Sequence, residues 1–213
     1  MINYKILNDS IEYYEKAGFQ RIETPWAITK AISDITKPKG AGDFTIAEKN
    51  KVLVASAEQG FLYLYNKGFL PKGRWQSISP CFRDESFDLL HTKYFMKNEL
   101  IITDNVCNEQ LGFVVKCARD FFRKYCLGLP ILHPVSVGYV DDVLIVDTVN
   151  GKDVVVSDED IMSETYKYQS YDLTFRGIEL GSYGIRDCGI MKYIYGTGVA
   201  LPRLTRAISI VSS

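Results

Sequence analysis

Apolar residues recur at helical spacing in several segments of this chain. Residues 3–17 carry them at i, i+4 and i+7, which predicts an amphipathic helix. The same spacing predicts the longest helix over about residues 105–127, with Asp104 as its expected cap. Two shorter helices are expected, one running through Asn66 and one beginning near Pro202. Helices therefore lie near both ends and in the middle of the chain.

Between these helices the pattern changes to period two or to short apolar runs, which are typical of strands. The expected strands are residues 19–24, 51–55, 135–139, 143–149, 153–156, 170–175, 178–182 and 192–195. Residues 36–45 are expected to form a loop because they are rich in Pro and Gly. Strands mixed with helices in this way predict an α+β fold with a largely antiparallel sheet flanked by helices. We expect residues 1–213 to form one such domain.

The segment from Ser79 to Glu99 contains two strand-like runs around a short polar turn. Because side chains alternate across a strand, polar and aromatic residues gather on one face of each run. They are Cys81, Arg83 and Glu85 on the first run, and Phe95, Lys97 and Glu99 on the second. A guanidinium can bind a phosphate through two hydrogen bonds, an aromatic ring can stack on a base, and His91 can reach a terminal phosphate. The pattern predicts a nucleotide site; the alternative is a surface hairpin with an ordinary Arg–Glu pair.

Composition narrows the class of protein. The net charge is -1, with 24% charged and 46% hydrophobic residues, so charge alone gives no case for a polyanionic partner. The five cysteines form no CxxC pair, which favours a reduced, intracellular chain without structural zinc. No signal peptide and no apolar run of membrane-spanning length is present, so we expect a soluble cytoplasmic protein. P-loop and GxGxxG patterns are also missing from the sequence.

The run Phe82-Arg83-Asp84-Glu85, followed after a short loop by His91 and Phe95, resembles the second signature motif of class II aminoacyl-tRNA synthetases. The resemblance implies a class II synthetase-like fold and an ATP site. Arg83 would bind the α-phosphate and Glu85 the adenine amino group. His91 would approach the γ-phosphate, and Phe95 would stack on adenine.

Two further segments resemble the other motifs of this family. Residues 18–25 are similar to the first motif, which implies a homodimer interface. Residues 196–204 are similar to the third motif, which implies that its glycines let the triphosphate approach the backbone and that Arg203 binds ATP. Ala200 and Pro202 depart from the usual residues of that motif. Proline is nevertheless accepted in the first turn of a helix.

Residues 171–182 resemble the strand before the third motif in the aspartyl, asparaginyl and lysyl enzymes, and residues 178–186 are similar to asparagine synthetase A. The resemblance implies that Glu179 and Ser182 bind Mg²⁺, a cation that prefers oxygen ligands. It also implies that Arg186 reads an Asp- or Asn-like side chain. The alternative for Arg186 is a surface ion pair with Asp187 or Glu179.

Three other residues complete the expected site. By the same resemblance, Ser56 and Glu58 would hold the α-ammonium of an amino acid; alternatively Ser56 caps a helix with Glu58 in its first turn. Glu99 would help to place Mg²⁺, or is a structural acid paired with Lys97 or Lys93. Asp141-Asp142 and His133 are expected in a turn and a loop rather than in a metal site.

The implied function is ATP-dependent and Mg²⁺-dependent activation of an Asp- or Asn-like amino acid to an aminoacyl-adenylate. The acceptor would be tRNA, bound through its acceptor stem, or another carrier. We expect no anticodon-binding domain in these residues, and tRNA normally demands clustered Lys and Arg that the sequence lacks. An aspartate–ammonia ligase-like enzyme and a non-catalytic synthetase paralogue with a binding role are the alternatives.

Overall fold

The computed structural model describes residues 1–37, 42–84, 92–126, 131–134, 170–175 and 178–212. Three expected strands (residues 135–139, 143–149 and 153–156) lie outside the described residues, as do Glu85, His91 and Asp141-Asp142. The rest of the chain is sufficient to define the sheet, the helices around it and most of the expected site.

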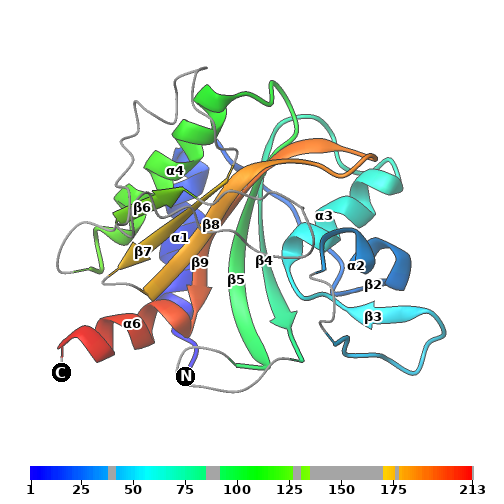
Figure 1. Ribbon diagram of the computed structural model, residues 1–213, viewed down its shortest axis with the longest axis horizontal. Coiled ribbons are helices and arrows are strands. Elements are labelled where there is room, and N and C mark those ends of the chain that lie inside the picture. Colours follow the sequence, from blue (N-terminus) through cyan, green and yellow to red (C-terminus); the bar gives the residue numbers. More distant parts are fainter. Residues whose placement is uncertain (38–41, 85–91, 127–130, 135–169, 176–177, 213) are drawn as a thin grey trace, which may run out of the picture.

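The described residues form a seven-stranded sheet in which the strand order is β1-β4-β5-β9-β8-β7-β6 (Figure 1). From one edge to the other the strands are β1 (Gln20–Arg21), β4 (Arg74–Phe82), β5 (Tyr94–Ile102), β9 (Lys192–Leu201), β8 (Ile178–Asp187), β7 (Ser170–Phe175) and β6 (Ile131–Pro134). β1 pairs with β4 in parallel, and all the other pairs of this sheet are antiparallel. The predicted α+β fold with a largely antiparallel sheet is confirmed.

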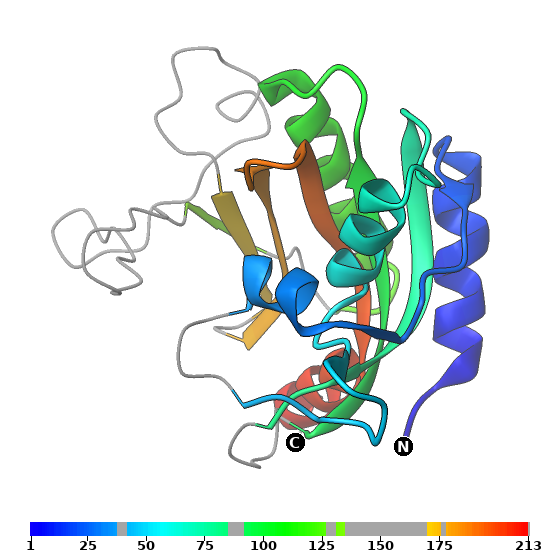
Figure 2. The same ribbon diagram turned by 90° about the vertical axis from the view of Figure 1, so that its right-hand side faces the viewer.

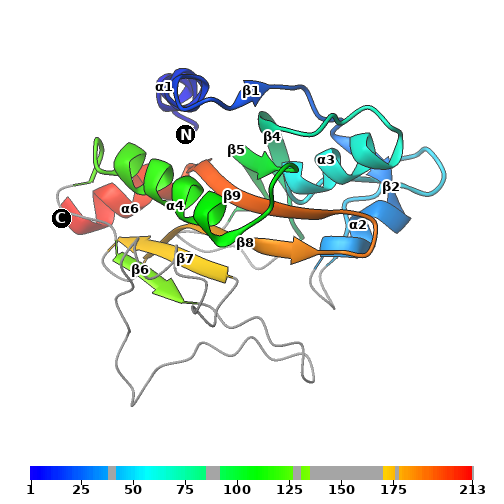
Figure 3. The ribbon, with the colours of Figure 1, turned by 90° about the horizontal axis from the view of Figure 1, so that it is seen from above.

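Three helices cover one face of the sheet. They are α1 (Tyr4–Lys16), α4 (Asn108–Phe122) and α6 (Arg203–Ser212), which lie together on one side in Figure 3. Leu100 and Ile102 of β5 point into this core, whereas Ile101 between them points to the opposite face. The alternation expected of a strand buried on both sides therefore holds at the centre of the sheet.

The opposite face carries a second group of elements. It consists of α2 (Lys30–Thr36), α3 (Ala57–Asn66) and a separate hairpin of β2 (Ala27–Thr29) and β3 (Lys51–Leu53). Figure 2 shows α1 and α2 on opposite sides of the sheet. Ile28, Ile32 and Phe61 join these elements to Ile101 and Tyr193 of the sheet in one buried cluster. This cluster leaves part of the sheet uncovered, and the site lies there.

Several local expectations were wrong. The long helix begins at Asn108 with Cys107 as its N-cap, not at Asp104. The expected loop at residues 36–45 begins with the last residue of α2, a helix that the periodicity did not predict. His133, expected in a loop, lies in β6 opposite Asp172 of β7. For α2 and β6, packing or pairing with a distant segment accompanies the local structure.

Gly196 and Gly198 of β9 serve helix packing. A Cβ at Gly196 would lie 2.7 Å from Cγ1 of Val114 on α4, and one at Gly198 would lie 2.9 Å from the ring of Tyr14 on α1. Such distances are shorter than van der Waals contact, so no side chain fits here without displacement of the helices. These glycines face the helical layer, while Thr197 between them lines a cavity on the other face. On the helical side these glycines are thus closely approached by Tyr14 of α1 and Val114 of α4.

Candidate active site

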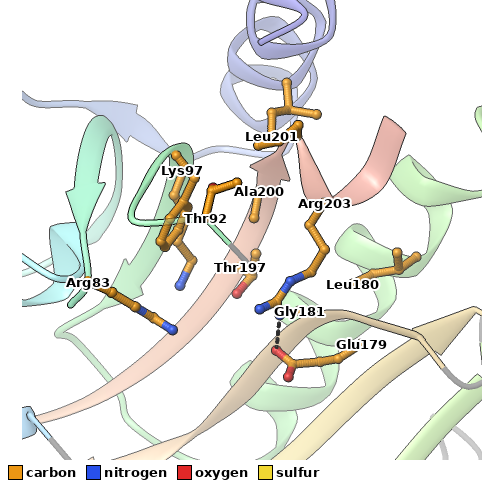
Figure 4. A pocket seen from close by; sticks show the side chains of 12 residues that line it. Arg83, Thr92, Lys97, Glu179, Leu180, Gly181, Thr197, Ala200, Leu201 and Arg203 are labelled. Atoms are coloured by element: carbon orange, nitrogen blue, oxygen red, sulfur yellow. Dashed lines mark ion pairs between the residues drawn. The ribbon is translucent and has the colours of Figure 1, made fainter. Parts of the chain in front are cut away.

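Two adjacent cavities open on the face of the sheet that α1 and α4 leave free. The first lies between the β4–β5 hairpin, β8, β9 and the start of α6. Its polar lining includes Arg83, Thr92, Lys97, Glu179, Thr197 and Arg203 (Figure 4). The second extends from the hairpin to α3 and β8, and its lining includes Ser56, Glu58, Glu99, Ser182, Arg186 and Tyr195. Together they contain every expected site residue that the structure describes.

The hairpin brings Arg83 and Phe95 together in the first cavity. The guanidinium carbon of Arg83 lies 5.1 Å from the centroid of the Phe95 ring, and its Nε donates a hydrogen bond of 3.2 Å to the carbonyl oxygen of Ala55. A cation over an aromatic face is an attractive contact that also fixes the orientation of both groups. The cavity therefore presents a positioned guanidinium beside an aromatic ring.

Arg203, the first residue of α6, faces Arg83 across this cavity (Figure 4). Its Nη1 lies 3.1 Å from Oε1 of Glu179 on β8. Glu179 remains almost half exposed, so its carboxylate is accessible from the cavity. Two arginines and a carboxylate thus surround a space in which a polyphosphate and its cation could be held.

Asp172, which the sequence did not single out, lies next to one of the expected Mg²⁺ ligands. It lies on β7 directly opposite Ser182 of β8, and the Ser182 side chain hydrogen-bonds to it. The pKa of Asp172 is raised to about 6, because burial and the charge of Glu179 raise it more than Ser182 and Arg203 lower it. Two carboxylates that repel each other gain stability from a cation between them.

These oxygen donors fit Mg²⁺. The cation takes oxygen ligands and is usually held by one or two carboxylates together with substrate phosphates and water. Among the described residues no three His, Cys, Asp or Glu side chains form a complete metal site. Asp172, Glu179 and Ser182 therefore match a cation that a nucleotide would help to hold, rather than a cation held by protein alone.

The second cavity contains a partly buried ion pair between two of the expected substrate residues. Nη1 of Arg186 lies 2.6 Å from Oε1 of Glu58, and the hydroxyl of Tyr193 donates a 2.7 Å hydrogen bond to the same oxygen. Burial, together with the Glu58 carboxylate, raises the pKa of Tyr193, so its hydroxyl stays protonated as a donor. The Arg186 guanidinium also lies 4.6 Å from the centroid of the Tyr195 ring. Arg186 pairs here with neither Asp187 nor Glu179, the partners considered from sequence.

Ser56 and Glu99 lie in the same cavity. The Ser56 hydroxyl caps α3 by accepting a hydrogen bond of 3.4 Å from the backbone N–H of Glu58, and it also donates to Glu99. Glu99 is 1% exposed and pairs with Lys97 at 2.8 Å, whereas Lys93 pairs with Asp84. Burial raises the pKa of Glu99, and the positive charge of Lys97 opposes this shift. Glu179 lines the first cavity, whereas Ser182 and Glu99 line the second, so the structure divides the three expected Mg²⁺ ligands between two adjacent cavities.

Solved structures with the same fold are class II aminoacyl-tRNA synthetases. Two structures of pyrrolysyl-tRNA synthetase from Desulfitobacterium hafniense each superpose with a TM-score of 0.65. The first is 17% identical, and the match covers 95% of this chain and 67% of the synthetase. The second is 16% identical, and the match covers 98% of this chain and 69% of the synthetase. Cytoplasmic serine-tRNA ligase from Naegleria fowleri in complex with AMP gives a TM-score of 0.65 at 16% identity, with 95% of this chain and 52% of the ligase covered. The chain thus spans about half the length of that ligase.

No protein-family model matches the chain, and no curated protein matches it significantly. Within the part of the chain that the structure describes, none of the helices has the length and apolar character needed to cross a membrane. The predicted class II synthetase-like fold is confirmed by the structural neighbours.

Proposed function

We propose that this chain, built on the fold of class II aminoacyl-tRNA synthetases, activates an amino acid with ATP to form an aminoacyl-adenylate. The observation that carries the proposal is the meeting of two cavities at Arg83, which lines both. One cavity has the cations and oxygen donors suited to a polyphosphate, and the other has carboxylates suited to an ammonium group. Adenylation requires that two such ligands meet at one positively charged point.

The first cavity is the proposed ATP site. Arg83 would bind the α-phosphate, Phe95 would stack on adenine, and Arg203 would bind the distal phosphates. Glu85 and His91 are proposed for the adenine amino group and the γ-phosphate. Mg²⁺, held by Glu179, Ser182 and Asp172, would neutralise charge on the phosphate oxygens.

The second cavity is the proposed amino-acid site. The carboxylate of Glu58 and the hydroxyl of Ser56 would hold the α-ammonium, and Glu99 supplies a second negative charge close to Ser56. Arg186 would read the side chain of an Asp- or Asn-like substrate, because a guanidinium donates two hydrogen bonds to a carboxylate or to a carbonyl oxygen.

The reaction needs no covalent protein nucleophile. A carboxylate oxygen of the amino acid attacks the α-phosphorus, the bond from that phosphorus to the bridging oxygen breaks, and pyrophosphate leaves with the electron pair. The physical work is to hold two anions together and to stabilise the charge that develops during transfer. Arg83 and Arg203 would supply this positive charge on opposite sides of the first cavity.

As the acceptor of the activated amino acid we propose the acceptor stem of tRNA or another carrier.

We also propose that the chain forms a homodimer. Support for the homodimer comes from residues 18–25, which resemble the first motif. This segment borders a groove lined by Ile22, Trp26, Ile78 and Met96, and Trp26 is 57% exposed. An aromatic residue of this size at the edge of an apolar groove is suited to contact with a second chain.

Amino-acid-dependent exchange of pyrophosphate into ATP tests the proposal. Wild-type protein, assayed with each of the twenty amino acids, should exchange with one or a few, and Arg83→Ala should abolish the exchange. Arg123→Ala is the matched control because Arg123 is an exposed arginine at the end of α4 that pairs only loosely with Asp120, at 3.5 Å. Lack of exchange with every amino acid would favour a non-catalytic paralogue, and release of asparagine with ammonia would favour the ligase alternative.

A further inference from the structure

Lys97 lines both cavities, and among the described lining residues only Arg83 does the same. It stands between Phe95 and Glu99 on β5, so the three side chains leave the sheet on one face. Figure 4 shows the Lys97 ammonium pointing into the first cavity, on the same side as the Arg83 guanidinium. The wall shared by a nucleotide cavity and an amino-acid cavity is where their reacting atoms must meet.

The ammonium of Lys97 is held in place by Glu99. Its Nζ lies 2.9 Å from Oε1 and 2.8 Å from Oε2 of that carboxylate, and the Lys97 side chain is 12% exposed. A lysine side chain is otherwise flexible and would lose conformational entropy on binding a ligand. Here that ordering is already present in the folded protein, so the positive charge is positioned before any substrate arrives.

Glu99 leaves Lys97 with binding capacity. An ammonium group has three N–H donors, and the contacts to the two oxygens of Glu99 occupy at most two of them. Glu99 is in addition hydrogen-bonded by Ser56, so Lys97 is not its only partner. If Lys97 served the fold alone, a neutral pair of similar volume would do so at a lower desolvation cost.

We infer that Lys97 is a second cationic catalytic residue of the proposed adenylation, acting beside Arg83; this inference rests on the proposed function. The N–H that Glu99 leaves free on its ammonium donates to a non-bridging oxygen of the α-phosphate. As the new oxygen–phosphorus bond forms, the attacking carboxylate oxygen loses negative charge and the non-bridging oxygens of the α-phosphate gain it. The bond to pyrophosphate then breaks, and pyrophosphate leaves with the electron pair. Lys97 gives up no proton, since the carboxylate attacks as an anion and pyrophosphate leaves as one.

A double-mutant cycle separates this role from simple neutralisation of Glu99. Lys97→Met, Glu99→Gln and the double variant are compared with wild type by the single-turnover rate of adenylate formation and by kcat and KM of exchange. A positioned donor that acts in the transition state is worth about a hundredfold or more in kcat. Lys97→Met should therefore lower kcat about a hundredfold in the wild-type and in the Glu99→Gln background, with a smaller change in KM.

A purely structural Lys97 gives a different pattern. If Lys97 only neutralises Glu99, then Glu99→Gln removes the charge that needs neutralising. Lys97→Met would have no further effect on kcat in the Glu99→Gln background. That result would overturn the inference. The double variant has a neutral pair and should fold even if Lys97→Met alone does not. Lys5→Met is the matched control, because Lys5 is an exposed lysine paired with Asp9 at 3.0 Å, away from both cavities. If wild type itself exchanges with no amino acid, the proposed function fails, and the role of Lys97 fails with it.

Discussion

Arg186 of β8 and Glu58 of α3, which are 128 positions apart in the chain, form an ion pair with a distance of 2.6 Å between Nη1 and Oε1. Tyr193 donates to the same carboxylate oxygen, and the Tyr195 ring lies against the guanidinium. The two charges expected to read an amino acid therefore neutralise each other before a substrate binds. A substrate side chain that approaches Arg186 also approaches a negative charge.

This pair predicts that a carboxamide is preferred to a carboxylate. A carboxamide offers a carbonyl oxygen to Arg186 and carries no charge, whereas a carboxylate would bring a second anion beside Glu58. We expect kcat/KM of exchange to be at least about tenfold higher with asparagine than with aspartate, since a misplaced like charge costs more than about 1.4 kcal/mol. Equal use of both, or preference for aspartate, would contradict the role of the pair in specificity.

Asp172 predicts a dependence of stability on pH. Its pKa of about 6 lies above the ordinary value of 3.8 because burial and Glu179 disfavour the charged form. The folded protein thus binds this proton more tightly than the unfolded chain. The resulting stabilisation is complete below the ordinary pKa and is lost as the pH rises through about 6.

Asp172→Asn should remove that pH dependence. It should also raise the free energy of unfolding of the metal-free protein at neutral pH by up to about 3 kcal/mol, since each pKa unit corresponds to about 1.36 kcal/mol. The free energy of unfolding from urea titrations at several pH values measures this. Mg²⁺ with ATP should raise the melting temperature of wild type and raise that of the variant less. Identical pH profiles for the two proteins would show that Asp172 does not titrate in this range.

Substitution of Gly196 by alanine is expected to disturb packing of the fold without weakening the binding of ATP. A Cβ there would lie 2.7 Å from Val114 and 2.9 Å from Tyr183, so Gly196→Ala should destabilise the fold by about 1–3 kcal/mol. Val114→Ala in the same chain removes the clashing methyl groups and should recover part of that loss. The dissociation constant for ATP should stay within about threefold of wild type, because the contacts are on the helical face. A large loss of ATP affinity in a folded Gly196→Ala protein would instead favour the glycine–phosphate contact implied by the motif.

Period-two spacing was sufficient to predict one face of the site. Phe95 and Lys97 line the first cavity, Lys97 and Glu99 line the second, and all three were expected on one face of the returning strand. The strand at Ser170–Phe175 was also predicted with its observed ends. These features depend on neighbours along the chain, which the sequence displays directly.

Features that depend on distant partners could not be predicted in this way. Asp172 shares the polar face of its strand with Ser170 and Thr174, and only its pairing opposite Ser182 places it beside an expected Mg²⁺ ligand. The helix α2 has seven residues, too few to be stable alone, and exists because Ile32 packs against the α3 cluster. The protein partners that the sequence offered for Arg186, as the alternative to a substrate side chain, were Asp187 and Glu179, but folding places Glu58 beside it.

The central claim is that an amino-acid carboxylate attacks the α-phosphorus of ATP at this site. Its most direct test uses the active amino acid labelled with isotopically heavy oxygen in the carboxylate and hydroxylamine to trap the activated product. Attack at the α-phosphorus leaves one labelled oxygen in the AMP that is released, which mass spectrometry detects. Label in AMP is the result that this account predicts. Label in inorganic phosphate, with ADP as the other product, would contradict it, because the carboxylate would then have attacked the γ-phosphorus.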